Sequence, residues 1–561
     1  MNGSVPIVRE PMHAFARLLD RLSFEPRRTA KEALLVDYFR TTPDPDRGYA
    51  LAALAGSLDF PHAKPALLKG LVTERVDPVL FGLSYDFVGD LSETIALMWT
   101  APAGRPDDGA EPLALRDVVS GLRGAGRTQA PALLSTWLDR LDEIGRWALL
   151  KLITGGLRVG VSARLAKTAV ARLGRLEPDD IEEIWNGLAT PYAELFAWAE
   201  GRADRPRNVD PAPFRPPMLA HPVNEEKDFA ALDAADFAAE WKWDGIRVQA
   251  AAGREPGGMH GRRLYSRSGE DISAAFPDLL DHLGFDAAID GELLVVRDGA
   301  VQPFSDLQKR LNRKSAGARI IADYPVAIRA YDLLAVDGED LRSLPFHARR
   351  TRLERFVAEL ASPRIDLSPL VPFDGWAELA TARHEPGRLL GEADAAAVEG
   401  VMLKRRAAPY LPGRPKGEWF KWKRDPFLID AVLMYAQRGH GKRSSFYSDY
   451  TFGVWRGAPD ARELVPVGKA YFGFTDEELR EIDRFVRANT QNRFGPVREV
   501  VHTPERGLVV EVAFEGLNRS GRHKSGLAMR FPRISRLRWD KIPAEADRID
   551  TLEALLSATR A

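Results

Sequence analysis

The chain contains no cysteine among its 561 residues. This absence excludes disulfide bonds, thiolate catalysis and every zinc site built on cysteine, including the four-cysteine kind. Low-complexity segments and repeats of a fixed period are missing too, so fibrous and solenoid architectures are not indicated. An apolar fraction of 45% with 28% charged residues is ordinary for a globular protein.

Long apolar runs are also missing. No segment approaches the roughly 18 residues that a membrane-spanning helix needs. The first residues, MNGSVPIVREPMHAF, have no basic region followed by an apolar core, so they do not indicate a secretory signal. We therefore expect a cytoplasmic protein that has no membrane partner.

The net charge is only −1, so bulk attraction cannot draw the chain to a polyanion. Basic residues are instead concentrated in two runs. Residues 404–424 carry eight Lys or Arg against one acid, and residues 519–541 again carry eight against one. A single such run is most often a solvated face. Because both runs are interleaved with Trp and Phe, we favour phosphate binding.

A chain of this length exceeds one hydrophobic core, since single cores stop growing near roughly 250 to 300 residues. We expect three domains. Up to about residue 200, apolar residues recur at helical spacing, as in MHAFARLLDRL and APALLSTWLDRLDEIGRWALLKLI. Residues 201–218 then pack five prolines and four arginines into eighteen positions, which indicates an extended linker. The first boundary is placed at residue 212.

Beyond the linker the apolar period shortens. Runs such as EWKWDGIRVQAAA, AAIDGELLVV and PVAIRAYDLLAV predict antiparallel strands, and the Asp-Gly pairs that begin at residues 244, 290, 298 and 337 are turn signals. The segment FHARRTRLERFVAEL predicts a helix between them. We expect an α+β domain over 213–425. Over 426–561 strands dominate, with one helix in TDEELREIDRFVRAN, which fits a five-stranded barrel.

The stretch EWKWDGIRV, residues 240–248, places two charges in an otherwise apolar strand. On a strand, Lys242 and Asp244 would face one side while Trp241 and Trp243 face the other. A lysine beside carboxylates is either a structural ion pair or a nucleophile. For an isolated K-x-D-G the ion pair is the better interpretation, so the choice depends on the rest of the sequence.

Six further motifs follow in order: YSRSGED, AIDGELL, IRAYDLL, EGVMLK, WFKWKRD and RFPRISRLRWDK. Together with EWKWDGIRV they resemble the ordered motifs of ATP-dependent polynucleotide ligases and capping enzymes, over residues from about 216 to 541. The helical part, most clearly GGLRVGVSARLAKTAVARL, is similar to the DNA-binding domain of the larger DNA ligases. The sequence therefore resembles an ATP-dependent DNA ligase of the larger form.

This resemblance implies a helical DNA-binding domain over 1–212, an adenylation (nucleotidyltransferase) domain on antiparallel sheets over 213–425, and an OB-fold barrel over 426–561. It implies that Lys242 takes AMP from ATP, that AMP passes to the 5′-phosphate of a nick, and that the 3′-hydroxyl then seals the strand. The partner would be nicked double-stranded DNA, and the enzyme would be a monomer on the bacterial nucleoid. Replication, repair or recombination could each use it.

The chemistry explains the residue types. A lysine attacks phosphorus only when neutral, whereas its unperturbed pKa is about 10.4, so burial and neighbouring cations must lower that pKa. Arg247, Lys421 and Lys423 can supply this field and hold the α-phosphate. Because each step builds charge on phosphoryl oxygens, we also expect Mg²⁺ or Mn²⁺.

The resemblance also assigns roles residue by residue. These are Glu240 for the adenine, Glu292 for the ribose hydroxyls and the metal, Tyr331 for stacking on the base, Glu399 for the metal, Arg267 as the arginine of the second motif, Lys404 at the nucleotide, and Arg538 and Lys541 at the β and γ phosphates in a closed state. Pro415 occupies the place of a further family arginine. Either Arg414 or Lys416 would then fill that role.

Three alternatives compete with this interpretation. An RNA ligase or capping-type nucleotidyltransferase shares the lysine chemistry, but the large helical domain and the PPMLA entry sequence favour DNA. An NAD-dependent ligase normally carries a four-cysteine zinc site, which this sequence cannot form. A catalytically inactive nick-binding protein would lose the lysine or its carboxylates, and all of these are present.

Overall fold

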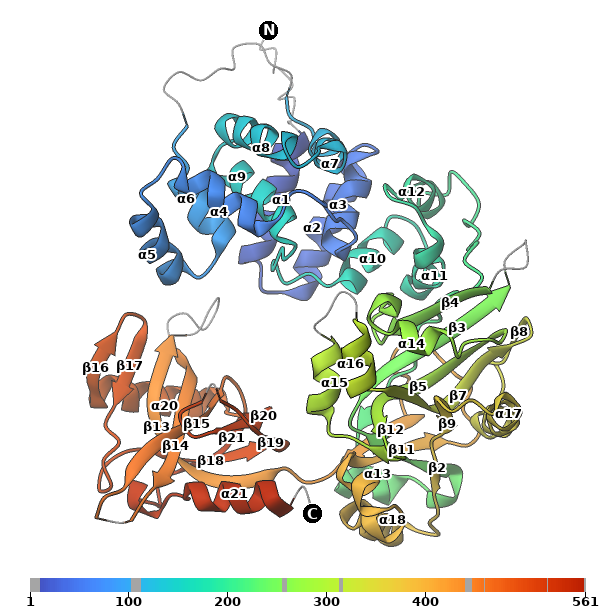
Figure 1. Cartoon of the computed structure of the whole chain (residues 1–561), viewed down its shortest axis with the longest axis vertical. Helices are drawn as coiled ribbons and strands as arrows, with labels where there is room; N and C mark the ends of the chain where they lie inside the picture. Colours follow the sequence, from blue (N-terminus) through green and yellow to red (C-terminus); the bar gives the residue numbers. More distant parts are fainter. Residues whose placement is uncertain are drawn as a thin grey trace. The chain divides into compact units, whose positions relative to one another are not determined.

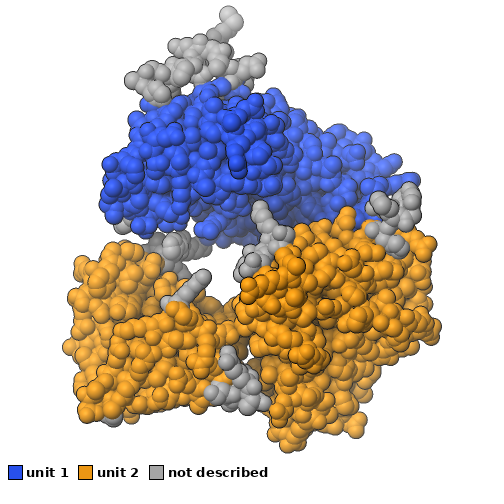
Figure 2. All heavy atoms as spheres, in the orientation of Figure 1, with its two compact units in different colours: residues 1–213 blue, residues 214–561 orange. Residues whose placement is uncertain are grey.

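A computed structural model of the chain describes residues 11–101, 112–254, 260–311, 316–438, 446–458, 460–521 and 523–558. The chain divides into two compact units, residues 1–213 and 214–561 (Figure 2). The first is helical, and the second contains antiparallel sheets with a curled C-terminal sheet, as the sequence predicts (Figure 1). The division of the second unit at residues 425 and 426 stays a prediction.

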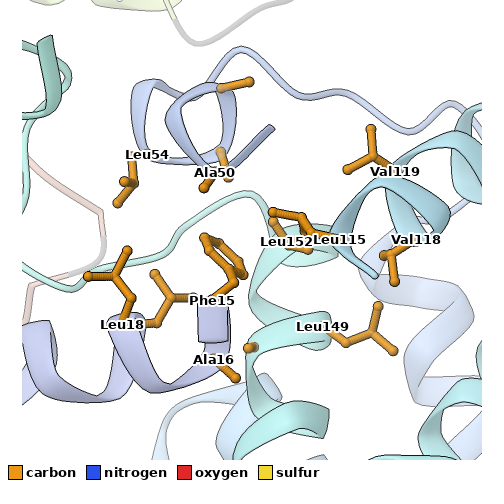
Figure 3. Close-up of a cluster of buried hydrophobic side chains, with 14 of the residues drawn as sticks. Phe15, Ala16, Leu18, Ala50, Leu54, Leu115, Val118, Val119, Leu149 and Leu152 are labelled. Atoms are coloured by element: carbon orange, nitrogen blue, oxygen red, sulfur yellow. The ribbon is translucent and has the colours of Figure 1, made fainter. Parts of the chain in front are cut away.

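The first unit is built of helices. They are α1 (Pro11–Phe24), α2 (Arg28–Thr41), α3 (Asp46–Ala55), α4 (Pro65–Thr73), α5 (Pro78–Val88), α6 (Leu91–Met98), α7 (Leu115–Gly124), α8 (Gln129–Arg140), α9 (Glu143–Thr154), α10 (Ala163–Ala171), α11 (Pro178–Ile184) and α12 (Ala193–Ala199). Their apolar stripes meet in one core, where Phe15 of α1, Ala50 of α3, Leu115 of α7 and Leu149 of α9 are buried (Figure 3). The helical spacing seen in the sequence therefore becomes a single bundle.

Two sheets form the first part of the second unit. One has the order β1-β12-β11-β2-β10. The other has the order β4-β3-β5-β7-β8, with β6 beside β5 and β9 beside β7. The strands are β1 (His221–Pro222), β2 (Phe237–Trp243), β3 (Ile246–Arg254), β4 (His260–Ser266), β5 (Ala287–Arg297), β6 (Ala300–Val301), β7 (Val326–Val336), β8 (Glu339–Asp340), β9 (Ile365–Leu367), β10 (Leu370–Val371), β11 (Val398–Arg405) and β12 (Trp419–Lys423).

Helices lie between these strands in the chain. They are α13 (Glu225–Ala231), α14 (Pro277–Leu280), α15 (Phe304–Leu311), α16 (Ala318–Asp323), α17 (Phe346–Leu360), α18 (Trp376–His384) and α19 (Glu392–Ala396). Helix α17 has the bounds of the predicted segment FHARRTRLERFVAEL. It packs against β7 and β9 of the second sheet.

The Asp244-Gly245 pair is a turn between the two sheets, because β2 belongs to one sheet and β3 to the other. Asp244 is therefore not on the strand with Lys242, which corrects the expected placement. A Cβ at Gly245 would lie 2.5 Å from the carbonyl oxygen of Leu293 and 2.9 Å from Cγ of Glu292. Only glycine lets the turn approach β5 this closely.

Of the other three Asp-Gly pairs, two are turns and one lies inside a strand. Asp298-Gly299 and Asp337-Gly338 are turns in which both residues have positive φ, as predicted. Asp290 instead lies inside β5, so the turn predicted there is wrong. A Cβ at the following glycine, Gly291, would lie 2.9 Å from the carbonyl oxygen of Arg329 on β7. The glycine at this position serves close strand contact rather than chain reversal.

The C-terminal sheet curls because one long strand, β13 (Phe427–Arg438), pairs with β14, β17 and β18. Its strands number seven in the described residues, where we expected five: β13, β14 (Tyr447–Arg456), β15 (Glu463–Ala470), β16 (Thr490–Phe494), β17 (Val497–Val500), β18 (Val509–Phe514) and β21 (Arg533–Arg538). A separate pair joins β19 (Gly516–Arg519) and β20 (Leu527–Arg530).

Two helices accompany the curled sheet. The predicted one is α20 (Asp476–Asn489), which begins with a capping box between Thr475 and Glu478. The other is α21 (Ile549–Ala558), whose Leu552 and Leu556 join the core of the sheet. In the described ranges of both units, no helix combines the length and the apolarity that crossing a bilayer requires.

Candidate active site

A cavity of about 880 Å³ lies in the second unit, lined by both sheets and by residues of the C-terminal region. It gathers most of the residues that the sequence motifs single out. The predicted residues that line it are Glu240, Lys242, Arg247, Arg267, Glu292, Tyr331, Glu399, Lys404, Arg414, Lys421 and Lys423. Motifs far apart in the chain therefore meet at one place.

Lys242 is presented by β2. Its neighbours Trp241 and Trp243 are buried in the core on one face of the strand, and the lysine side chain, 21% exposed, lies on the other. Its Nζ contacts a carboxylate oxygen of Glu399 on β11. The anchored strand and this ion pair fix the amine inside the cavity.

The two carboxylates beside the lysine differ electrostatically. Burial raises the pKa of Glu292, on β5, to about 8, although Lys242 and Arg247 oppose the rise. The pKa of Glu399 is lowered, because Lys242 and Lys423 outweigh the burial that acts to raise it. Glu292 is thus a carboxyl group whose charge lacks compensation, and a cation bound beside it would supply that compensation.

Two lysines of β12 add positive charge. Burial lowers the pKa of Lys421, and the nearby Lys423 and Lys242 lower it further. For Lys423, burial acts to lower the pKa, but Glu399 and Glu515 outweigh it and the pKa is raised. Lys423 Nζ lies 3.3 Å from Glu399 and 2.8 Å from Glu515. Both lysines lie where a phosphate placed at Lys242 would need cations.

Arg247 lines the cavity but is already engaged. Its Nη2 donates to Asp290 Oδ2 at 2.5 Å and to the Tyr410 hydroxyl at 2.9 Å, and its Nη1 donates to the carbonyl oxygen of Met218 at 2.6 Å. The guanidinium is thereby held rigidly at the cavity wall. Asp290, which we expected in a turn, is the buried carboxylate that holds it.

Some of the remaining predicted residues line the cavity and others do not. Arg267 and Arg414 are exposed and line the cavity, whereas Lys416 is absent from its described lining. Arg538 and Lys541 also do not line it among the described residues. Both contact Asp430 on β13, at 3.2 Å and 2.5 Å, so these two cations are held together within the C-terminal region.

Two family models match the part of the chain that contains this cavity. The family model for the ATP dependent DNA ligase domain matches residues 217–423, and the model for the ATP dependent DNA ligase C terminal region matches residues 443–541. A probable DNA ligase of Koribacter versatilis is 32% identical over 97% of this chain and 95% of its own length. This chain belongs to the ATP-dependent DNA ligases.

Further relatives of the ligase support the same assignment. DNA ligase 1 of Korarchaeum cryptofilum is 30% identical over 96% of this chain and 97% of its own length. The solved structure Pmar-Lig_PreS3 covers 93% of this chain and 99% of its own, with a TM-score of 0.52 and 15% identity. That likeness extends over both units and shows the fold alone.

The C-terminal region of the ligase contacts the K-x-D-G turn directly. Arg530 Nη2 donates to Asp244 Oδ1 at 2.7 Å, and Nη1 contacts the other carboxylate oxygen. Arg530, Phe531 and Glu515 also line the cavity. Arg530 opens the last sequence motif, RFPRISRLRWDK, whereas the sequence carried no signal for Glu515.

A Mg²⁺ ion in this cavity would have few protein ligands. The described residues hold no group of three or more His, Cys, Asp or Glu arranged around a metal. Mg²⁺ is commonly bound through one or two carboxylates and the substrate phosphates. Glu292, whose charge lacks compensation, and Glu399 both face the cavity, so the donor set fits.

Proposed function

We propose that this ligase seals nicks in duplex DNA through a Lys242–AMP intermediate. The observation that carries the proposal is the position of Lys242 in the cavity, with Glu399 in contact and Lys421 and Lys423 lining the same space. The same nick-sealing reaction would serve replication, repair and recombination. The proposed working form is a monomer.

In the first step the Lys242 amine attacks the α-phosphorus of ATP. A P–N bond forms, the bond from the α-phosphorus to the bridging oxygen breaks, and pyrophosphate leaves with the electron pair. The nitrogen gives up its excess protons to water or to the departing pyrophosphate as the phosphoramidate forms. Glu399, which contacts Nζ, is placed to orient the amine, and Lys421 and Lys423 stabilise charge on the phosphoryl oxygens.

Glu292 and Glu399 would hold the metal, which when bound supplies charge stabilisation for the phosphoryl group. Pro415 stands where the family has an arginine, and Arg414, which lines the cavity, acts in place of that arginine. AMP then passes from Lys242 to the 5′-phosphate of the nick, forming a pyrophosphate linkage. The 3′-hydroxyl attacks that 5′-phosphate, a phosphodiester forms and AMP leaves.

The first unit is proposed to hold the duplex. Its loop GGLRVGV, residues 155–161, ends at Ser162, which caps α10. Arg158 in this loop has a φ of +52° and is exposed, and buried Lys31 of α2 contacts the carbonyl oxygen of Val159. Such a braced loop with an outward arginine suits contact with the sugar-phosphate backbone in the minor groove.

The test is to incubate the enzyme with α-labelled ATP and Mg²⁺ and to map the label by mass spectrometry. We expect one AMP on Lys242, and we expect Lys242→Ala to abolish it. Lys227→Ala, an exposed lysine on α13 outside the cavity, is the matched control and should label normally. AMP on a different lysine would refute the assignment.

A further inference from the structure

One carboxylate in the lining of the cavity lies between two buried cations. Glu240 Oε1 accepts from Arg350 Nη1 at 2.9 Å, and Glu240 Oε2 lies 2.5 Å from Lys404 Nζ. All three side chains are at most 6% exposed, yet Glu240 and Lys404 line the cavity. With a cation at each oxygen, the carboxylate can only accept hydrogen bonds from a ligand.

Arg350 is fixed in place on α17. Its Nη2 donates to the carbonyl oxygen of Ser368 at 2.8 Å, and its Nε donates to Glu354 at 2.9 Å. The Ser368 hydroxyl in turn accepts from Trp243 Nε1 at 2.9 Å. Since Trp243 ends the strand that carries Lys242, the arginine network is tied to the strand with the reactive amine.

Lys404 connects this carboxylate to the aromatic wall of the cavity. Its Nζ lies 4.4 Å from the ring centre of Tyr331 and 4.5 Å from that of Trp419. Both rings line the cavity. Although Nζ forms an ion pair with Glu240, it has no aligned hydrogen-bond acceptor in the part of the chain that the structure describes.

We propose that Arg350 is a positioning residue that sets the base specificity of this ligase. By holding Glu240 as a fixed acceptor, Arg350 makes the cavity accept a purine with an amino group at position 6 and reject a 6-oxo purine. An amino group donates to the carboxylate, whereas a carbonyl oxygen would place lone pair against lone pair. The inference rests on the proposed adenylylation of Lys242.

The cost of burying the cluster supports a role toward a ligand. Three charged side chains out of water are commonly no more stabilising than apolar groups of the same volume. If these ion pairs served only to join α17 to the sheet that contains β2, their side chains would not need to line the cavity. Here its two inner members reach the cavity wall, while its outer member, Glu354, is 46% exposed.

The experiment measures the rate of covalent nucleotide transfer to Lys242 in the full-length enzyme with three substrates: ATP, ITP, and purine riboside triphosphate, which lacks the 6-amino group. The variants are Arg350→Gln and Arg350→Lys. Arg352→Gln is the matched control, since Arg352 lies on the same helix, is 41% exposed and pairs with Glu339 at the surface.

We expect the unaltered enzyme to prefer ATP over ITP by at least about 100-fold in kcat/KM, because a buried acceptor left unpaired is costly. Arg350→Gln should reduce this ratio by about tenfold or more, mainly by raising KM for ATP. Arg350→Lys should restore part of it, and Arg352→Gln should leave it unchanged. Removing the 6-amino group from the nucleotide should matter much less in Arg350→Gln than in the unaltered enzyme.

A purely structural role predicts a different result, in which Arg350→Gln lowers the rate with ATP and ITP by the same factor. That outcome would overturn this inference and leave the proposed function intact. If Arg350→Gln does not fold, Glu354→Gln loosens the arginine from the surface side and should shift the ratio in the same direction by a smaller factor. An unchanged ratio in Glu354→Gln would then count against the inference. Failure of the unaltered enzyme to label with ATP would refute the proposed function itself.

Discussion

The burial of Glu292 makes the folding free energy of the protein depend on pH. Its pKa is raised to about 8 in the folded protein, mainly by burial, whereas the ordinary value is 4.5. Between these values the unfolded chain has lost the proton and the folded chain retains it. The folded state therefore binds more protons, and the stability falls as pH rises from about 4.5 to about 8.

We expect Glu292→Gln to remove this dependence. In urea unfolding without metal, the free energy of unfolding of the unaltered enzyme should fall relative to that of Glu292→Gln between pH 5.5 and pH 8.5. Each pKa unit corresponds to about 1.4 kcal/mol, and the total should be a few kcal/mol at most. Parallel stability curves for the two proteins would contradict a raised pKa at Glu292.

Arg414 and Lys416 provide a matched pair on one loop. Both are exposed, but only Arg414 belongs to the described lining of the cavity. Arg414→Ala should lower the rate of adenylylation by about 10- to 100-fold, since each factor of ten equals about 1.4 kcal/mol of lost transition-state binding and a charge-assisted phosphate contact is of that size. Lys416→Ala should leave the rate within about twofold. The reverse order in a single-turnover assay would assign the role to Lys416.

The end of strand β21 and the residues after it act as one element. Arg538 and Lys541 both form an ion pair with Asp430. The two cations should therefore stay close to each other if the C-terminal region moves. We predict that this element serves the first step, because its cations would meet only the pyrophosphate that leaves. Arg538→Ala and Lys541→Ala should block adenylylation and spare sealing of nicks that already carry AMP.

Arg536 is the control for that element, because it lies on the same strand and is exposed. Arg536→Ala should leave both assays unchanged. The assays are label transfer to Lys242 and sealing of a pre-adenylylated nick without ATP. An equal loss of both activities in the Arg538 and Lys541 variants would mean that the element also acts on DNA.

The two compact units lead to a prediction for the whole chain. Residues 1–213 have their own core, so removing residues 1–212 should leave the second unit folded with its cavity. Adenylylation of Lys242 should persist in this truncated chain. Binding to nicked duplex should weaken, and its salt dependence should flatten, because each lost phosphate contact removes about 0.9 from the log-log slope.

The measurement is nicked-DNA affinity at several salt concentrations for the full and truncated chains. Arg158→Ala in the full chain should show a small part of the same change, near one phosphate contact. If truncation changes neither the affinity nor the slope, the first unit does not hold DNA, and a protein-interaction role becomes the better explanation.

The sequence alone predicted the elements and the family well, because those signals are local. Helical spacing identified the N-terminal bundle, the segment FHARRTRLERFVAEL identified the bounds of α17, and alternation around Lys242 identified the buried side of β2. The ordered motifs contain most of the side chains that line the cavity, although Arg538 and Lys541 are absent from its described lining. The local signal failed at pairs such as Asp290-Gly291, because the same two residues suit either a chain-reversing turn or a close contact between neighbouring strands.

Only the tertiary structure decided which charges are buried. Helix α17 carries Arg349, Arg350 and Arg352, which look alike in the sequence, yet the first two are buried and the third is partly exposed. Arg350 meets its carboxylate, Glu240, 110 positions earlier in the chain. A buried charge is tolerated only where a distant partner compensates it, and that partner is set by how the strands and helices pack. No local pattern could therefore have distinguished Arg350, which pairs with Glu240, from the other arginines of the same helix.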